Sequence, residues 1–218
     1  MKTIFLCLLG ISSIFTGAFG QDSTRLAAWN NFKGRYAGDW TIRWDRATGT
    51  PSSILGSRIT SFTGTPEQIA TAFLESEKEI LGIKDVPNEV VLERENSSPR
   101  GGNRMIFRQR LNNVPVLRSG YLVAVDGGGG IYYVSGDYFP DARVNTIPRL
   151  TVDESQKIIN NDFSTETAAS VSRPTLWIKP SIGQDKQDYR LVYKADISTS
   201  SPVGAWEYLV DAQTGVII

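Results

Sequence analysis

Histidine is absent from the sequence, and cysteine occurs once, as Cys7. Histidine is the usual general base near neutral pH and the usual zinc ligand, and cysteine supplies the common thiolate nucleophile. Without these side chains a Ser-His-Asp triad and a Cys-His pair are excluded, and zinc-dependent hydrolysis of the usual kind is not expected. Any catalysis would have to come from carboxylates or lysines.

Net charge is also missing, because 23 basic residues balance 23 acidic ones. No excess of either sign therefore favours a nucleic acid or an anionic membrane as a partner. Hydrophobic residues make up 40% of the chain and charged residues 21%, which is typical of a soluble globular protein. The length of 218 residues allows one or two domains with a sizeable core.

A long hydrophobic run is missing as well. The apolar stretch from Ile4 to about Phe15 is shorter than the roughly 20 residues that a membrane span needs. It follows Lys2 and precedes small residues, which predicts a secretory signal peptide over residues 1–20, cut near Gly20. The mature chain would then have no cysteine and no integral membrane segment, and would be periplasmic or extracellular. A retained anchor is the weaker alternative.

Four consecutive glycines, Gly127–Gly130, raise the question of a phosphate-binding loop. Such a loop lies between a strand and the N-terminus of a helix. Residues 121–125 suit a strand, but Ile131–Val134 is β-branched and aromatic and does not suit a helix. Asp126 followed by glycine between two strands predicts a β-hairpin instead.

Two helices have clear start signals. Thr65, Pro66 and Gln68 predict a capping box at the start of a helix that ends at Gly82, and Thr151 with Glu154 three residues on predicts a second. Strands follow each helix, with one more before the first helix. They are expected at residues 39–45, 89–95, 105–111, 121–125, 131–134, 175–179, 189–197 and 205–210.

A helix followed by antiparallel strands, twice over, predicts an α+β fold of two consecutive modules, each with a helix packed on an antiparallel sheet. The predicted boundaries are a signal peptide at 1–20, an N-terminal β and loop segment at 21–64, a first module at 65–140, a linker at 141–150 and a second module at 151–218.

No residue stands out as catalytic, cofactor-binding or metal-binding, and we expect none of these. An acidic pair acting as a glycosidase dyad is the weak alternative, because the acids are scattered: Asp45, Glu93, Glu95, Asp126, Asp137 and Asp141. Tryptophans could supply protein contacts if some are exposed, and there are five: Trp29, Trp40, Trp44, Trp177 and Trp206.

The first predicted module resembles a known family, the fungalysin/thermolysin propeptide (FTP) domain. The matching residues are 107–116, with the run FRQRLNNVPV, then 121–126, and 134–138 after the glycine turn. They follow the family's order of an arginine-glutamine strand, a Val-Pro-Val turn, a hairpin and a closing strand. Asn113 stands where the family usually has glycine, and asparagine tolerates the left-handed conformation that such a turn needs.

The second predicted module resembles the PepSY domain that commonly follows. It matches in Thr151–Glu154, Leu191–Ala195 and Trp206–Gly215. Together the two resemblances span residues 65–218, and residues 40–56 resemble the leading segment of such propeptides more loosely.

These resemblances imply the pro-region of a secreted thermolysin-like metallopeptidase. Such a pro-region is not an enzyme. It acts as a folding chaperone and a temporary inhibitor of the catalytic domain, in cis in a longer precursor or in trans. A secreted or surface-associated protein-binding module with no protease partner stays the alternative.

Overall fold

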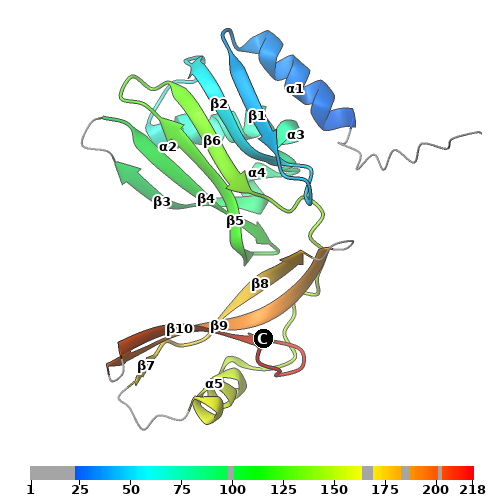
Figure 1. Cartoon of the computed structure of the whole chain (residues 1–218), viewed down its shortest axis with the longest axis vertical. Helices are drawn as coiled ribbons and strands as arrows, with labels where there is room; N and C mark the ends of the chain where they lie inside the picture. The colour runs from blue at the N-terminus through cyan, green and yellow to red at the C-terminus, as the bar shows by residue number, and fades with distance from the viewer. Residues whose placement is uncertain (1–22, 98–100, 164–168, 183–186, 201–202) are drawn as a thin grey trace, which may run out of the picture.

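The computed structural model describes residues 23–97, 101–163, 169–182, 187–200 and 203–218, so the predicted signal peptide lies outside the described residues. Helices and strands together confirm the predicted α+β fold (Figure 1). The elements are α1 (Ser23–Arg35), β1 (Trp40–Trp44), β2 (Pro51–Ile59), α2 (Pro66–Ser76), α3 (Lys78–Leu81), α4 (Val86–Glu89), β3 (Val90–Ser97), β4 (Asn103–Leu111), β5 (Val114–Val125), β6 (Ile131–Asp137), α5 (Val152–Asp162), β7 (Ala169–Val171), β8 (Thr175–Ile182), β9 (Gln187–Ser200) and β10 (Val203–Asp211).

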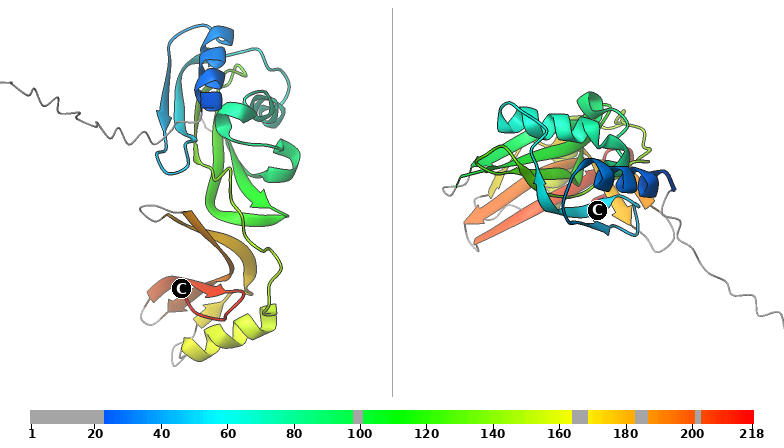
Figure 2. Two further views of the ribbon diagram at one scale, coloured as in Figure 1. Left: turned by 90° about the vertical axis from the view of Figure 1, so that its right-hand side faces the viewer. Right: turned by 90° about the horizontal axis from the view of Figure 1, so that it is seen from above.

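One sheet runs through the molecule in the order β1-β2-β6-β5-β8-β9-β10, with β4 also on β5, β3 on β4 and β7 on β9. The described strand pairs are antiparallel except for β5 and β8, which run parallel where Val116 meets Ile178. This short parallel contact joins two antiparallel halves, which stack along the long axis of the molecule (Figures 1 and 2).

The first core lies between helices α1–α4 and one face of strands β1–β6. Its most aromatic part surrounds Phe32, which is fully buried. The ring of Phe32 lies 5.1 Å from Trp29, 4.7 Å from Tyr36 and 5.2 Å from Trp40, measured between centroids. Edge-to-face and offset aromatic pairs of this kind add to the gain from burying the rings.

Helix α1 corrects the prediction that residues 21–64 form only strands and loops. Trp29, Phe32 and Tyr36 recur at helical spacing, and all three are buried against the first core. The helix forms because packing of this aromatic face outweighs the weak helix propensity of the aromatic residues.

The helix predicted from Thr65 to Gly82 begins and ends as expected, but it breaks in the middle. Thr65 and Gln68 form the capping box, and Gly82 closes α3 in the left-handed conformation at a φ of 75°. The break falls at Glu77, an acidic residue that is only 2% exposed. Its carboxylate accepts hydrogen bonds from Arg35 at 2.5 Å and Tyr36 at 2.7 Å.

The second core lies between α5 and one face of β8, β9 and β10. Its α5 begins with the predicted capping box between Thr151 and Glu154. Ile159 of α5 is fully buried and packs in the same cluster as Tyr193 of β9 and Val210 of β10. α5 lies on the side of this sheet that points away from the first core, so no helix of the described residues covers the opposite face (Figures 1 and 2).

Both predicted turns of the first half are confirmed. The glycines join β5 to β6 as a hairpin, with the Asp126 carboxylate accepting from the N–H groups of Gly128 and Gly130. Burial pushes the pKa of Asp126 up, but Arg58 and these two N–H groups outweigh it, so the pKa lies below its usual value. Asn112 and Asn113 have φ angles of 49° and 65°, which is the left-handed conformation expected for Asn113.

No helix in the part of the chain that the structure describes has both the length and the apolar character needed to cross a bilayer.

Candidate functional site

The site is organised by an irregular stretch of β5, Val116–Ser119, which we call the β5 bulge. The register of β4 on β5 jumps here from the pair Arg108–Gly120 to the pair Arg110–Pro115. β5 therefore contributes more residues than β4 can pair, and the surplus residues leave the ladder.

Each residue of the β5 bulge takes a different direction. Val116 enters the second core and pairs with Ile178 of β8. Leu117 packs with Val192 and Leu209 in a small cluster between the two cores. Because residues of the β5 bulge pack with both halves of the molecule, the bulge fixes the position of one half of the sheet relative to the other half.

Arg118 carries local backbone strain at this position. Its φ of 54° lies in the left-handed region, which costs a non-glycine, non-asparagine residue about 1–2 kcal/mol. Its side chain is 88% exposed and reaches the carboxylate of Glu207 on β10 at 3.6 Å. Strain of this kind at a solvent-facing charged residue is a feature of functional sites.

A buried amide holds the β5 bulge in place. The side-chain oxygen of Gln109, which is 4% exposed, accepts from the Ser119 hydroxyl and from the N–H of Phe139 at 3.0 Å. Its side-chain nitrogen donates to the carbonyl of Phe139 at 2.8 Å. One glutamine thus ties β4, the bulge and the segment after β6 together, which gives a structural role to the glutamine of the predicted arginine-glutamine strand.

A cleft of about 440 Å³ opens between the two halves at the β5 bulge, and we call it the inter-core groove. Its walls come from the turn between β1 and β2, from β5 and the end of β6, and from β8 and β10. It is lined by Asp45, Thr48, Leu117, Arg118, Asp137, Phe139, Lys179, Pro180, Glu207 and Leu209.

The floor of the inter-core groove is apolar. Leu117 and Leu209 line it, and both belong to a cluster with Val192, which is fully buried, and with the partly buried Trp177. The rim carries charges of both signs, such as Arg118 and Glu207. An apolar centre within a polar rim is the usual anatomy of a protein-binding surface.

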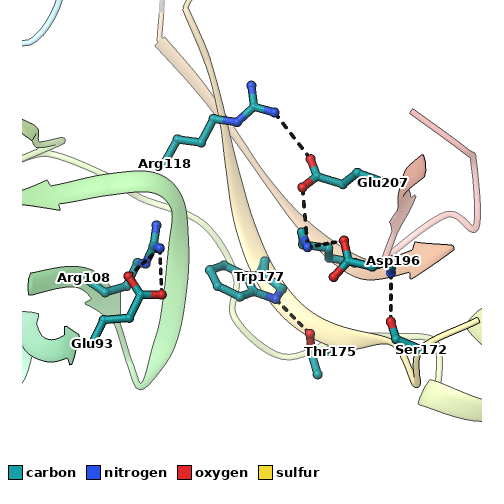
Figure 3. Close-up of polar contacts among 9 residues, drawn as sticks. Glu93, Arg108, Arg118, Ser172, Thr175, Trp177, Asp196 and Glu207 are labelled. Atoms are coloured by element: carbon teal, nitrogen blue, oxygen red, sulfur yellow. Dashed lines mark hydrogen bonds and ion pairs between the residues drawn. The ribbon is translucent and has the colours of Figure 1, made fainter. Parts of the chain in front are cut away.

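The charges beside the groove form a connected network on the helix-free face of the second sheet (Figure 3). Lys194 of β9, only 17% exposed at its side chain, contacts Asp196 at 2.7 Å and Glu207 at 3.4 Å. Asp196 and Glu207 lie directly opposite each other on β9 and β10. Two like charges in that position repel, so Lys194 between them stabilises the pair.

A second part of the network bridges from the first half to the second (Figure 3). Arg108 of β4 binds Glu93 through both carboxylate oxygens, at 2.8 Å and 2.6 Å. The guanidinium of Arg108 also lies 5.6 Å from the ring centroid of Trp177 on β8, a cation–π contact. Trp177 in turn donates to the hydroxyl of Thr175 at 2.9 Å, so its ring orientation is fixed.

A shallower hollow of about 250 Å³ lies next to the inter-core groove and shares Arg118 and Asp137 with it. Two glycines in its wall let the strands pass closely. A Cβ on Gly120, at a φ of 141°, would lie closer to the Phe107 carbonyl oxygen than any atomic contact allows, and one on Gly136 would collide with the carbonyl oxygen of Gly120. Bare backbone therefore lines this hollow.

The scattered acids considered as a catalytic pair are mostly engaged elsewhere. Asp45 and Asp137 do line the inter-core groove, but Asp45 accepts from the N–H groups of Ala47 and Thr48 at 2.9 Å and 2.8 Å and so closes the β1–β2 turn. Three of the others form ion pairs: Glu93 with Arg108, Asp126 with Arg58, and Asp141 with Lys84. Glu95 is exposed on β3.

The five tryptophans divide between the cores and the surface. Trp29 is buried, and Trp40 and Trp44 pack against the first core. Trp177 packs against the cluster of Leu117, Val192 and Leu209, and Trp206 is 54% exposed on β10. Sequence reasoning did not single out Arg118. The available signal was Ser119-Gly120 within a strand, since an interior glycine often marks a bulge.

Within the described ranges, no group of three or more His, Cys, Asp and Glu side chains is arranged to hold a metal ion. No family model matches the chain, and no curated protein matches its sequence. Among solved structures, the chain is similar to the Bacillus megaterium YpeB C-terminal domain, at 13% identity and a TM-score of 0.43, over 90% of this chain and 94% of that one. A likeness at this level does not fix function, and the FTP and PepSY assignments stay predictions.

Proposed function

We propose that this chain is a secreted, periplasmic or extracellular, non-catalytic module that binds another protein in the inter-core groove. Its expected partner is the catalytic domain of a thermolysin-like metallopeptidase, for which it acts as a folding chaperone, an inhibitor or both, in cis or in trans. The groove carries the binding part of the proposal, because its apolar floor and mixed-charge rim suit a protein surface. The metallopeptidase part comes from the family resemblance of residues 65–218.

Binding is favoured over catalysis by the state of the groove's charges. The Glu207 carboxylate forms ion pairs with Lys194 and Arg118, and the Asp45 carboxylate accepts hydrogen bonds from the backbone of its own turn. The sequence also has no histidine to serve as a base. These groups shape and charge a surface, whereas a catalytic acid or base needs a proton poised for transfer.

Rigidity supports a chaperone role. The groove is held by the Gln109 amide, by the Arg108–Glu93 pair and by the contact of Arg108 with Trp177. A surface that is already ordered loses little entropy when it binds, so it can stabilise a partner's native-like state.

The test is a binding and inhibition assay. The purified secreted chain is titrated into a thermolysin-like metallopeptidase, and peptide hydrolysis and recovery of activity from the denatured enzyme are measured. We expect inhibition or faster recovery, and a loss of about five- to thirty-fold in affinity for Arg118→Asn, since asparagine keeps the left-handed backbone but removes the guanidinium.

The matched control is Arg149→Asn. Arg149 is exposed in the connector before α5, so this variant removes the same charge away from the groove. Equal affinities for the two variants would contradict the role of the groove. No effect of the unchanged chain on any such enzyme would remove the metallopeptidase as partner.

The alternative, a binding module with no protease partner, is favoured by one observation. Trp206 exposes 54% of its surface on an edge strand, away from the groove floor. Exposed tryptophans are common anchors of protein interfaces. Capture of a non-protease partner, lost in Trp206→Ala and retained in Arg118→Asn, would favour this alternative.

A further inference from the structure

We infer that the outer edge of β10, from Val203 to Tyr208, binds an extended segment of the partner protein as an added antiparallel strand. This inference extends the proposed function, because it names the kind of segment that the partner supplies. It rests on backbone geometry, on exposed apolar residues and on charge at this edge, and it is tested separately from the metallopeptidase assignment.

The outer edge of β10 already accepts a strand along part of its length. The N–H of Ile218 donates to the carbonyl of Leu209 at 2.9 Å, and the N–H of Asp211 donates to the carbonyl of Val216 at 2.8 Å. Val210 and Ile217 therefore form an antiparallel bridge. Leu209 and Asp211 thus point their backbone groups outward, away from β9.

Regular alternation extends this geometry along the strand. β9 and β10 pair without a register shift from Val203 to Asp211, so Val203, Ala205 and Glu207 also point their N–H and C=O groups outward. β9 agrees with this assignment, because Asp196, which lies opposite Glu207, uses its own backbone to bind Ser172 on its other side. Among the described residues, no strand pairs with the outer edge of β10 from Val203 to Tyr208, on the side away from β9.

Half of the large apolar side chains that the structure shows exposed lie on β10 or on the segment that follows it. Five of the ten large apolar residues that the structure shows exposed lie within residues 203–218: Val203, Trp206, Val216, Ile217 and Ile218. Val203 is 89% exposed. Natural edge strands are commonly protected by lysine, proline or a bulge, and β10 has none of these between Val203 and Asp211.

Charge at the edge favours a foreign segment over a second copy of the chain. Glu207 faces Asp196 across the strands, and among the described cations only Lys194 lies within 4 Å of both. Two β10 edges paired about a two-fold axis at Ala205 would place Glu207 against Val203 of the other copy, with no added cation. A partner segment can place a lysine or arginine there instead.

The register then specifies the partner segment. An antiparallel strand that presents a basic residue opposite Glu207 presents its next residue opposite Trp206, on the other face of the sheet. An apolar residue suits that position, because an aromatic side chain paired with a β-branched one is a stabilising cross-strand pair. We therefore expect a segment with a basic residue followed by an apolar one, in an otherwise alternating β sequence.

The experiment uses a fluorescein-labelled peptide, Ser-Gly-Thr-Lys-Val-Thr-Val-Thr-Gly-Ser, and the same peptide with glutamate in place of lysine. Binding to the purified chain is followed by fluorescence anisotropy. We expect the lysine peptide to bind more tightly, by about three- to tenfold. In Glu207→Lys the preference should reverse toward the glutamate peptide.

Glu95→Lys is the matched control, since it makes the same charge change on the exposed part of β3. It should leave the preference for the lysine peptide unchanged. Ala205→Pro removes an outward N–H without removing a hydrogen bond to β9, and it should weaken the binding of both peptides. Thermal melting identifies any variant that fails to fold, and the Glu207→Lys reversal then carries the test alone.

Amide hydrogen exchange gives the sharpest readout. Saturation with the lysine peptide should slow exchange at Val203, Ala205 and Glu207 and leave Gly204 and Trp206 as they were. Uniform protection, no protection, or a dimer in analytical ultracentrifugation in place of peptide binding would overturn the inference.

The two proposals fail separately. If the metallopeptidase is inhibited equally by the unchanged chain and by Ala205→Pro, the proposed function stands and the edge inference falls. If no metallopeptidase is affected but the alternating protection is seen, the edge inference stands and the metallopeptidase is not the partner.

Discussion

The two halves of the molecule differ in how completely their sheets are covered. The first half packs four helices, α1–α4, on one sheet face and centres its core on the fully buried Phe32. The described residues of the second half form one helix, α5, and half of the large apolar residues that the structure shows exposed lie at the edge of this half. The comparison indicates that the first half supplies most of the stability, while the groove side and the edge of the second half are left exposed, as the proposed binding role requires.

The largest expected effect separates the two halves by stability. Phe32→Ala leaves a cavity within an aromatic cluster and should lower the free energy of unfolding by about 3–5 kcal/mol. Trp206→Ala, which removes a larger but exposed ring, should cost less than about 1 kcal/mol. Urea denaturation measures both. Similar losses in the two variants would contradict the division between a stabilising half and a binding half.

A smaller loss is expected where the halves are tied together. Gln109→Leu leaves the N–H and C=O of Phe139 without their partner in a buried place, and it should cost about 1–3 kcal/mol. Gln156→Leu is the control, because the side chain of Gln156 donates to Asn160 at the surface of α5. If both variants unfold at the same urea concentration, the Gln109 amide does not hold the junction.

High pH should weaken the first half through its buried tyrosines. Burial and the hydrogen bond to Glu77 raise the pKa of Tyr36 to about 12, and burial also raises the pKa of Tyr121 and Tyr138. Above pH 10 the unfolded chain loses these protons first, so the free energy of unfolding should fall as pH rises from about 10 toward 12.

The check is urea denaturation at about pH 9 and about pH 11, on the unchanged chain and on Tyr36→Phe. The variant should lose less stability between the two pH values. If Tyr36→Phe loses as much stability between the two pH values as the unchanged chain does, Tyr36 does not contribute to the pH dependence.

The smallest effect concerns the strained residue of the groove. Arg118→Gly adopts a positive φ without a steric cost, so the free energy of unfolding should rise by about 0.5–1 kcal/mol while partner binding weakens. Thermal unfolding measures the change in stability, and the inhibition assay measures the change in partner binding. A variant that is both less stable and unchanged in binding would show that the strain has no functional purpose.

Local signals in the sequence predicted much of the fold. The capping boxes at Thr65 and Thr151, the hairpin after Asp126 and the turn at Asn113 depend on residues within a few positions of one another, and all four are confirmed. Helix α1 had a usable signal in the spacing of Trp29 and Phe32, but aromatic residues fit strands as well as helices, and only the packing decides between them.

The candidate site was much less predictable. Arg118 meets Glu207 across 89 positions of sequence, and Arg108 meets Trp177 across 69. Neither meeting follows from spacing, because both depend on the β5 bulge leaving β4 to reach β8. The buried position of Glu77 escaped prediction for the same reason, since its partners Arg35 and Tyr36 belong to the unpredicted α1.

The central claim, that the groove side of the second half binds a protein, is tested most directly by the five tryptophan indole N–H signals in an NMR titration with a thermolysin-like metallopeptidase. Trp177 packs against Leu117 and Leu209, which line the groove, and Trp206 lies on the β10 edge, whereas Trp29, Trp40 and Trp44 pack in or against the first core. We predict that the Trp177 signal shifts and that the three first-core signals stay in place. Shifts confined to the first-core signals, or no shift at saturating enzyme, would contradict the account.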